Sequence, residues 1–411
     1  MRVVLVFGAA YFLSYAFRAI NAVIAPALIS DLHLSNADLG LLSSAYFVGF
    51  ASLQLPLGVW LDKYGPRRTE SSLLLFAALG AAIFASSSTL TGLWIGRAMI
   101  GVGVSACLMA SLKAYRSWYA PERQSQLASW MLVFGTAGAL ATTVPVAALL
   151  PLIGWRGVFW LMSALIIAAT AQLFLRLRPV EQERMHATVS DEDNSLSYWA
   201  IFTHPYFRRM ALLGGVHQGG FMAVQTLWAG PWMTTVLGLS VEQTSEVLFG
   251  FNLCLMLAYL LLSWWAPRRV SYGDRPGWPA LKVVGIGISL SMLLQLSMLM
   301  LPYTWAWVLW LPFALLVTVS TLAQTHVSLS FPSALVGRVN SAYNLSLFIG
   351  AFSVQWGLGV LIDLFVAKGW TSSSAIRMAW AVYLAMQLYA LIRFVSSSAS
   401  VSATKNAPAV S

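Results

Sequence analysis

Apolar runs of about twenty residues or more follow one another along the whole chain, and short polar intervals separate them. A membrane-spanning helix needs roughly 20 apolar residues, so each run is long enough to cross a bilayer. The intervals carry Pro, Gly, Asn, Ser and paired charges, which are typical of loops. The pattern predicts twelve spans, over residues 3–29, 38–61, 70–89, 92–115, 124–150, 157–177, 206–236, 243–266, 280–300, 303–326, 341–365 and 374–396.

One polar interval is longer than the others and divides the chain nearly in half. It covers residues 178–205 and contains a cluster of acidic side chains. We therefore expect an all-α membrane protein with an N-terminal six-helix bundle over residues 1–177, a cytoplasmic linker over 178–205 and a C-terminal six-helix bundle over 206–396. The Ser- and Ala-rich residues 397–411 are expected to form a disordered cytoplasmic tail.

Composition and charge support this interpretation and set the orientation. The chain is 59% hydrophobic and 9% charged, far from the composition of a soluble domain. If the N-terminus lies inside, 18 of the 24 Lys and Arg residues fall in cytoplasmic segments, as the positive-inside rule requires. The net charge of +10 is then a consequence of topology and does not indicate nucleic-acid binding. We expect a multi-pass protein of the bacterial inner membrane with both termini in the cytoplasm.

A charged and glycine-rich segment follows the second predicted span. Its glycines allow a tight turn and close helix approach, its acid can cap or pair with a helix end, and its arginines lie at the inner membrane surface. The segment fits G-x-x-x-D-(R/K)-x-G-x-R-(R/K), and the residues that match are Gly58, Asp62, Lys63, Gly65, Arg67 and Arg68. This pattern resembles the signature between the second and third helices of major facilitator superfamily transporters. The resemblance implies two pseudo-symmetric halves that rock about a central site, with this motif as a gate.

Arg18 is the charged residue nearest the middle of the first predicted span. It lies about 22 Å along that helix at 1.5 Å per residue, and Tyr15 and Asn21 share its face. A charge at this depth is expected to serve function. An arginine with neutral hydrogen-bonding neighbours can clamp a carboxylate or a phosphate. The alternative is a structural pair between Arg18 and an acidic residue, but no acid stands near the centre of a predicted span.

A narrower resemblance links the N-terminal half to the anion:cation symporter branch of that superfamily, which includes hexuronate and galactonate carriers. Tyr15-Ala-Phe-Arg18-Ala-Ile-Asn21 is similar to the first helix of that branch, in which the arginine contacts the acid group of the substrate. Arg97-x-x-x-Gly101-x-Gly103 resembles the superfamily signature in helix 4, which leaves Arg97 as a substrate contact, an outer gate or a structural residue. The carboxylates that exchange protons in this branch are missing.

The second half supplies polar residues that could face Arg18. His217 and the glutamines Gln218 and Gln225 lie in the seventh span, among glycines that would let the helix unwind. His217 could couple transport to protons or could be a neutral, hydrogen-bonded side chain. Asn344 in the eleventh span could line the cavity or bridge two helices.

These features predict a secondary transporter that moves a small organic anion by alternating access. The alternatives are a nitrate, nitrite or other inorganic-anion porter, a metabolite exporter, and a transporter-like sensor without transport. The sequence predicts no enzymatic activity, cofactor, metal site or nucleic-acid partner. The expected partners are a small anionic metabolite and the lipid bilayer, with protons left open, and the protein is expected to be a monomer.

Overall fold

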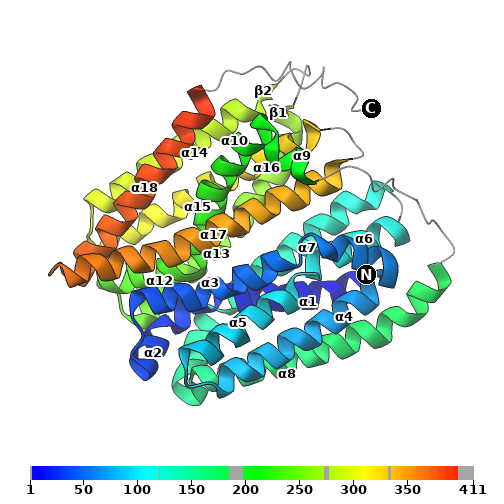
Figure 1. The fold of residues 1–411 in the computed structure, drawn as a ribbon, viewed down its shortest axis with the longest axis horizontal. Coiled ribbons are helices and arrows are strands. Elements are labelled where there is room, and N and C mark those ends of the chain that lie inside the picture. The colour runs from blue at the N-terminus through cyan, green and yellow to red at the C-terminus, as the bar shows by residue number, and fades with distance from the viewer. Residues whose placement is uncertain (1, 120, 185–197, 273–276, 332–334, 397–411) are drawn as a thin grey trace.

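The structure is a computed structural model that describes residues 2–119, 121–184, 198–272, 277–331 and 335–396. Nearly all of this part of the chain is helical, and its two strands form one parallel pair. Helices of residues 2–184 lie together in the lower part of Figure 1, and those that follow residue 198 lie above them. The predicted all-α membrane fold is therefore confirmed.

The first half of the chain forms eight helices. Their bounds are α1 (Arg2–Ala19), α2 (Asn21–Leu32), α3 (Asn36–Ser52), α4 (Pro56–Ser86), α5 (Leu90–Val104), α6 (Cys107–Trp118), α7 (Pro121–Ala141) and α8 (Val144–Arg184). Two of these, α4 and α8, each contain a reversal that is discussed below.

The second half begins with a short helix and ends with two long ones. The elements are α9 (Tyr198–Thr203), α10 (Pro205–Gly214), η1 (Gly215–Gly219), α11 (Gly220–Ala223), η2 (Val224–Trp228), α12 (Ala229–Pro231), η3 (Trp232–Val236), α13 (Val241–Arg269), β1 (Val270–Ser271), β2 (Trp278–Pro279), α14 (Ala280–Met300), η4 (Thr304–Leu309), α15 (Trp310–Thr318), α16 (Thr321–Leu329), α17 (Val336–Ala367) and α18 (Ser372–Ser396).

The twelve predicted spans correspond to these helices, although several spans are broken. Eight helices of the described chain are long and apolar enough to cross a membrane by themselves. The first span is the pair α1 and α2, bent by 46° at Ile20, where a single straight helix was expected. The second, fourth, fifth and tenth spans are interrupted at residues 53–55, 105–106, 142–143 and 319–320, and the helix of the seventh span is locally widened within residues 215–236.

The predicted polar loops after the second and fifth spans are each reduced to one glycine. Gly65 has φ 77° and Gly154 has φ 66°, so the chain reverses there between segments that are otherwise helical. Only glycine adopts this backbone region without strain, which confirms the tight turn predicted for Gly65. The helix after Gly154 also continues to Arg184, into the interval predicted as a linker. Residues 185–197 and 397–411 lie outside the described chain.

The seventh span is the most irregular part of the fold. Three π-helical turns, η1, η2 and η3, alternate with short α-helical pieces between residues 215 and 236. A π turn accommodates one more residue than an α turn, and such turns are frequent at functional sites. The glycine-rich sequence predicted that this span could unwind, and the structure shows a continuous but locally widened helix.

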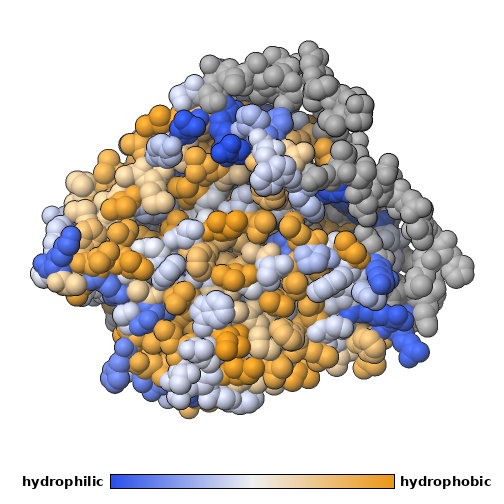
Figure 2. Space-filling model, in the orientation of Figure 1, coloured by the Kyte–Doolittle hydropathy of each residue, from blue (hydrophilic) through white to orange (hydrophobic). Residues whose placement is uncertain are grey.

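Glycines bring the helices of the first half into close contact. A Cβ on Gly80 would lie 2.7 Å from the Gly96 carbonyl oxygen, and one on Gly103 would lie 2.3 Å from the Ala77 nitrogen. Small residues allow this approach because lipid tails provide no hydrophobic drive for helix association. Outward-facing side chains are apolar, and Figure 2 shows them over the body of the molecule, with hydrophilic residues gathered toward its ends. This surface fits a lipid environment.

The two halves meet firmly at one end of the bundle, which we name the Asp363 end. The Asp363 carboxylate of α17 accepts hydrogen bonds from the Asn36 and Ala37 backbone N–H groups, at 3.2 and 2.6 Å, and from the Asn36 side chain. A Cβ on Gly359 would lie 2.3 Å from the Asn36 carbonyl oxygen. Further along the same helices, the Phe50 and Phe348 rings lie 4.5 Å apart.

The opposite end carries residues 58–68, and we name it the motif end. Here Gly58 has no atom within 4 Å of the position a Cβ would take, so the close approach expected of it is not seen in this structure. The neighbouring Val59, Trp60 and Tyr64 are exposed. The two ends therefore differ in how tightly their described residues are packed.

Candidate functional site

Arg18 lies in the last turn of α1, two residues before the bend at Ile20. Its side chain is partly exposed although it stands at mid-span. The guanidinium carbon lies 3.7 Å from the centre of the Tyr15 ring, a cation–π geometry. Among the described residues no acidic side chain pairs with Arg18, so the structural ion pair considered from the sequence is not formed.

Tyr11 and Tyr15 form the wall on which the arginine rests. Their ring centres are 4.9 Å apart in an edge-to-face arrangement. Gly135 of α7 makes room for both rings, because a Cβ at this position would lie 2.8 Å from Tyr11 and 3.1 Å from Tyr15. The Tyr15 ring lies against the guanidinium, and the Arg18 side chain remains partly exposed.

A second arginine of the first half is buried. Arg97 of α5 is 1% exposed, and neither its Nε nor its Nη1 has a hydrogen-bond partner. Its guanidinium carbon lies 5.5 Å from the Tyr46 ring centre. Tyr46 is also near enough to Arg18 for the charge of that arginine to act on the phenol hydroxyl. The Tyr46 hydroxyl donates to the Ser14 carbonyl oxygen at 3.3 Å. Arg97 is thus fully enclosed, with the Tyr46 ring as its described aromatic neighbour.

The second half contributes a tyrosine that the sequence interpretation missed. Tyr259 of α13 lies within electrostatic range of both Arg18 and Tyr15 and is partly buried. It belongs to the second half, whereas Arg18 and Tyr15 belong to the first. A single tyrosine in a long apolar run is a weak sequence signal, since the chain has 14 tyrosines.

Asn21 is buried in a contact between helices. Its side-chain N–H donates to the Ser43 hydroxyl at 2.7 Å, and its side-chain oxygen has no partner. The residue is 1% exposed. In this conformation it joins the start of α2 to α3 and does not lie open beside Arg18.

The described hydrogen bonds of His217, Gln225 and Asn344 lie within the second half. His217 is buried, and its Nε2 lies 3.1 Å from the Gln387 carbonyl oxygen, beside a small cavity lined only by second-half residues. Gln225 donates to Asn252 at 2.9 Å. Gln324 donates to Asn344 at 3.0 Å. Gln218 keeps a buried side-chain oxygen without a partner.

The described contacts of Lys63 and Arg67 in the gating motif are with residues of the first half. The Arg67 guanidinium carbon lies 4.6 Å from the Phe174 ring centre, and its Nη1 donates to the Phe174 carbonyl oxygen at 3.3 Å. Lys63 lies over the Tyr64 ring, and Arg68 is exposed. The Asp62 side chain lies outside the described residues, so its predicted contact with the second half stays a prediction.

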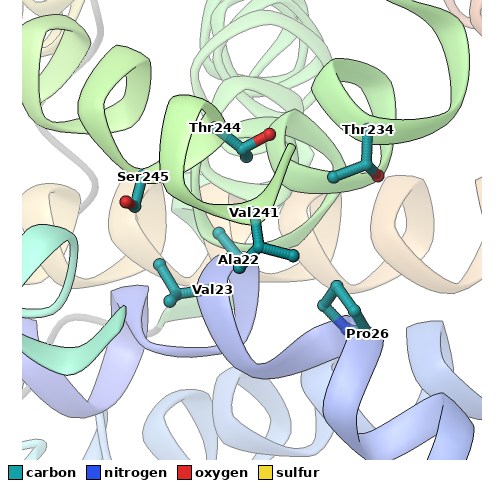
Figure 3. Close-up of a pocket in the computed structure, with 7 residues that line it drawn as sticks. All are labelled: Ala22, Val23, Pro26, Thr234, Val241, Thr244 and Ser245. Carbon is teal, nitrogen blue, oxygen red and sulfur yellow. The ribbon is translucent and has the colours of Figure 1, made fainter. Parts of the chain in front are cut away.

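A narrow crevice lies between the halves on the Asp363 side of Arg18 (Figure 3). Ala22, Val23 and Pro26 of α2 line one wall, and second-half residues, among them Thr234 and Thr244, line the other. The crevice has no charged group, so it lacks what an anion site needs.

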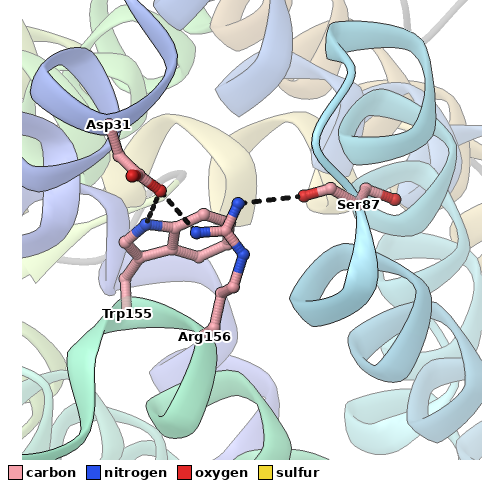
Figure 4. Close-up of polar contacts among 4 residues, drawn as sticks. All are labelled: Asp31, Ser87, Trp155 and Arg156. Carbon is pink, nitrogen blue, oxygen red and sulfur yellow. Dashed lines mark hydrogen bonds and ion pairs between the residues drawn. The ribbon is translucent and has the colours of Figure 1, made fainter.

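Near the same end, α2 is fastened within the first half (Figure 4). The Asp31 carboxylate forms an ion pair with Arg156 and accepts a hydrogen bond from the Trp155 indole at 3.1 Å. Arg156 also donates to the Ser87 carbonyl oxygen. These contacts follow directly after the turn at Gly154, so they fix that turn against the end of the first span.

The comparisons with known proteins agree with this architecture. A probable sulfoacetate transporter of Cupriavidus necator is 24% identical over 245 residues, 57% of this chain and 57% of that protein. The hexuronate transporter of Escherichia coli K12 is 27% identical over 186 residues, 44% of this chain and 42% of the relative. The chain thus spans about half the length of these curated relatives.

A solved structure shows the same fold over the whole chain. It is a bacterial homologue of the human lysosomal transporter Spinster in an inward-facing and occupied conformation, with TM-score 0.78 and 17% identity, covering 99% of this chain and 98% of that one. The sequence profile of the Major Facilitator Superfamily matches residues 7–355. These proteins are multi-pass membrane transporters, and the present chain belongs to the Major Facilitator Superfamily.

Proposed function

We propose that this protein is a secondary transporter that moves a small organic anion across the membrane, with Arg18 as its central anion contact. The observation that carries the proposal is the state of Arg18, a partly exposed guanidinium on a tyrosine wall without an acidic partner among the described residues. A positive charge at mid-span that lacks a counter-ion favours an anionic ligand. The named substrates of the relatives, sulfoacetate and hexuronate, are organic anions.

The geometry also favours a particular way of holding the anion. Arg18 can offer two parallel N–H donors to a carboxylate or sulfonate. Tyr15 and Tyr259 stand on opposite sides of the interface between the halves, so an anion at Arg18 would touch both halves. Arg97 adds a second positive charge at longer range through the low-dielectric interior.

We further propose that residues 1–177 and 206–396 act as two six-helix halves that rock about Arg18, with both termini in the cytoplasm of a bacterial cell. The positive loop charges support this orientation. In that orientation the Asp363 end faces outward, and its close packing makes the present structure an inward-facing state. We propose a monomer, since a single chain contains both halves.

Uptake into proteoliposomes tests the proposal. Mono- and dicarboxylates, sulfonates, sugar acids and nitrate would be screened with the purified protein. We expect an organic anion to be taken up, and Arg18→Ala to lower uptake by at least about 100-fold, since a charge-assisted bidentate contact in a dry site is worth roughly 3 kcal/mol. Arg393→Ala, at an exposed position of α18, is the matched control and should transport normally.

Three outcomes would contradict the proposal. Full transport by the Arg18→Ala variant would remove Arg18 from the site. Uptake of nitrate alone, with no organic anion transported, would favour the inorganic-anion alternative, in which Arg97 would be the second arginine. Binding of an anion without any transport would favour the sensor alternative.

A further inference from the structure

Three cations outside the anion site lie where α13 ends and α14 begins. Arg268 and Arg269 are the last two residues of α13, and Lys282 lies in the first turn of α14. All three side chains are exposed, and none forms an ion pair with an acid of the described chain. Because α13 starts beside the crevice on the Asp363 side, its last residues stand at the opposite end of the bundle. We name these three residues the basic rim.

The pair of short strands holds the two parts of the basic rim together. Val270 of β1 pairs with Trp278 of β2, and both strands lie at this edge of the second half (Figure 1). A Cβ on Gly277 would lie 3.0 Å from the Arg269 carbonyl oxygen. Since α14 begins at Ala280, directly after β2, the end of one helix is fixed beside the start of the other.

Exposed tryptophans accompany the basic rim. The side chains of Trp264 and Trp278 are 58% and 60% exposed. The Arg268 guanidinium carbon lies 4.9 Å from the Trp264 ring centre, and the guanidinium also donates to the Trp264 carbonyl oxygen. Tryptophan is enriched where a membrane protein crosses the boundary between hydrocarbon and water, with its ring at the level of the headgroups. The cations of the basic rim therefore stand at headgroup level.

Apolar side chains continue from the basic rim along both helices. Each helix carries exposed aliphatic residues at a spacing of three or four, which places them on one face below the cation. They are Leu261 and Leu257 on α13, below Arg268, and Ile286, Leu290 and Leu293 on α14, below Lys282. A cation at headgroup level above an exposed aliphatic stripe matches the two parts of a phospholipid.

Below the strands, α13 and α14 are joined by α15 and have few contacts with each other. The Phe251 ring of α13 lies 5.6 Å from the Trp310 ring at the start of α15. A Cβ on Gly287 of α14 would lie 2.8 Å from Val319, directly after α15. The protein itself therefore supplies little that connects the two stripes.

We propose that the basic rim binds the headgroup of one anionic phospholipid, whose acyl chains lie along the exposed stripes of α13 and α14. Arg268 offers several N–H donors to the phosphate oxygens, and Lys282 adds a compact positive charge from the other helix. Three cations select a headgroup of net negative charge, such as phosphatidylglycerol, over the zwitterionic phosphatidylcholine. The lipid thereby connects α13 with α14. This inference goes beyond the proposed function, since it concerns the outer surface of the second half and not the substrate.

Lipid retention by the full-length protein tests the site. The protein is exchanged into detergent with equal amounts of phosphatidylglycerol and phosphatidylcholine, and bound lipids are counted by native mass spectrometry. We expect the wild type to retain phosphatidylglycerol preferentially. In the double variant Arg268→Ala/Lys282→Ala the preference should fall about 25-fold, because each basic residue near an anionic headgroup contributes a factor of about five. A wild type without a preference would overturn the proposal.

The matched control removes two exposed charges elsewhere. Arg176→Ala/Arg178→Ala changes α8 of the first half and should keep the wild-type lipid preference. An equal loss in both double variants would show a diffuse effect of surface charge and would overturn the site. Inorganic phosphate forms a further arm of the experiment. Complete displacement of the lipid by millimolar phosphate would identify a site for a free anion, because a free anion makes no use of the aliphatic stripes.

A second measurement uses only the wild type, so it does not depend on how a variant folds. Phosphatidylglycerol with a photoreactive group in one acyl chain is reconstituted with the protein and activated by light. Mass spectrometry of peptides then locates the adducts. We expect them to concentrate within residues 257–269 and 280–293, and an even distribution over the lipid-facing helices would contradict a defined lipid site.

Discussion

The Asp363 end and the motif end of the bundle are held by different kinds of contact. At the Asp363 end, a carboxylate from the second half caps the first N–H groups of a helix in the first half, and a glycine brings the two backbones together. At the motif end, Arg67 is stacked on Phe174 of the same half. The first set joins the halves and the second stiffens one of them. When the two halves of a transporter rock, the contacts that join them must open without leaving unpaired polar groups.

The largest test of this comparison is a methyl group placed in the tight joint. In Gly359→Ala the added carbon would meet the Asn36 carbonyl oxygen at 2.3 Å, so the Asp363 end cannot close as it does here. We expect transport to fall by at least about tenfold, corresponding to about 1.4 kcal/mol. Gly357→Ala is the control on the same helix, because nothing lies within 4 Å of its Cβ position. Equal transport by the two variants would show that the joint is not required.

A smaller effect is expected when the joint keeps its shape but loses its charge. Asp363→Asn weakens the cap on the N-terminus of α3, an interaction worth about 1 kcal/mol, which changes a conformational equilibrium about fivefold. Distances between spin labels on α3 and α17 should shift toward an open Asp363 end. Asp38→Asn, which disturbs a cap formed with Ser35 inside the first half, should leave those distances unchanged. Identical distributions in all three proteins would contradict a latch at Asp363.

The smallest effect concerns the motif end. Arg67→Ala removes a cation–π contact and a hydrogen bond within one half, so we expect a loss of about 1 to 2 kcal/mol of stability without a change in spin-label distances. Thermal unfolding in detergent measures the loss. Arg68→Ala, at the exposed neighbouring position, should unfold at the wild-type temperature. A population shift in Arg67→Ala would show that the motif already joins the halves in this state.

The sequence predicted the spans well because the apolar runs are long and each carries its own signal. Gly65 illustrates this, since glycine before proline after a charged segment indicates a turn without any knowledge of the fold. Arg18 was also predictable, because a charge within an apolar run is rare.

Long-range packing could not be predicted in the same way. Asn36 and Asp363 are 327 residues apart in the chain, and nothing in either segment indicates the other. Tyr259 and Tyr46 became site residues only through the fold that surrounds Arg18. His217 and Gln225 are polar for local reasons, since each satisfies a partner in its own half. Glu70 shows the opposite case, an acid at the edge of a predicted span that is fully buried after the turn at Gly65.

The three π turns of the seventh span have a mechanical consequence. Each holds one residue more than an α turn, and returning that residue to α-helical winding would rotate everything beyond it by about 100°, the angle per residue of an α-helix. Gln218 lies in the first of these turns, with an oxygen that has no partner, and Gln225 lies in the second. The span can therefore rotate the side chains on either side of each π turn relative to one another while its backbone hydrogen bonds remain largely intact.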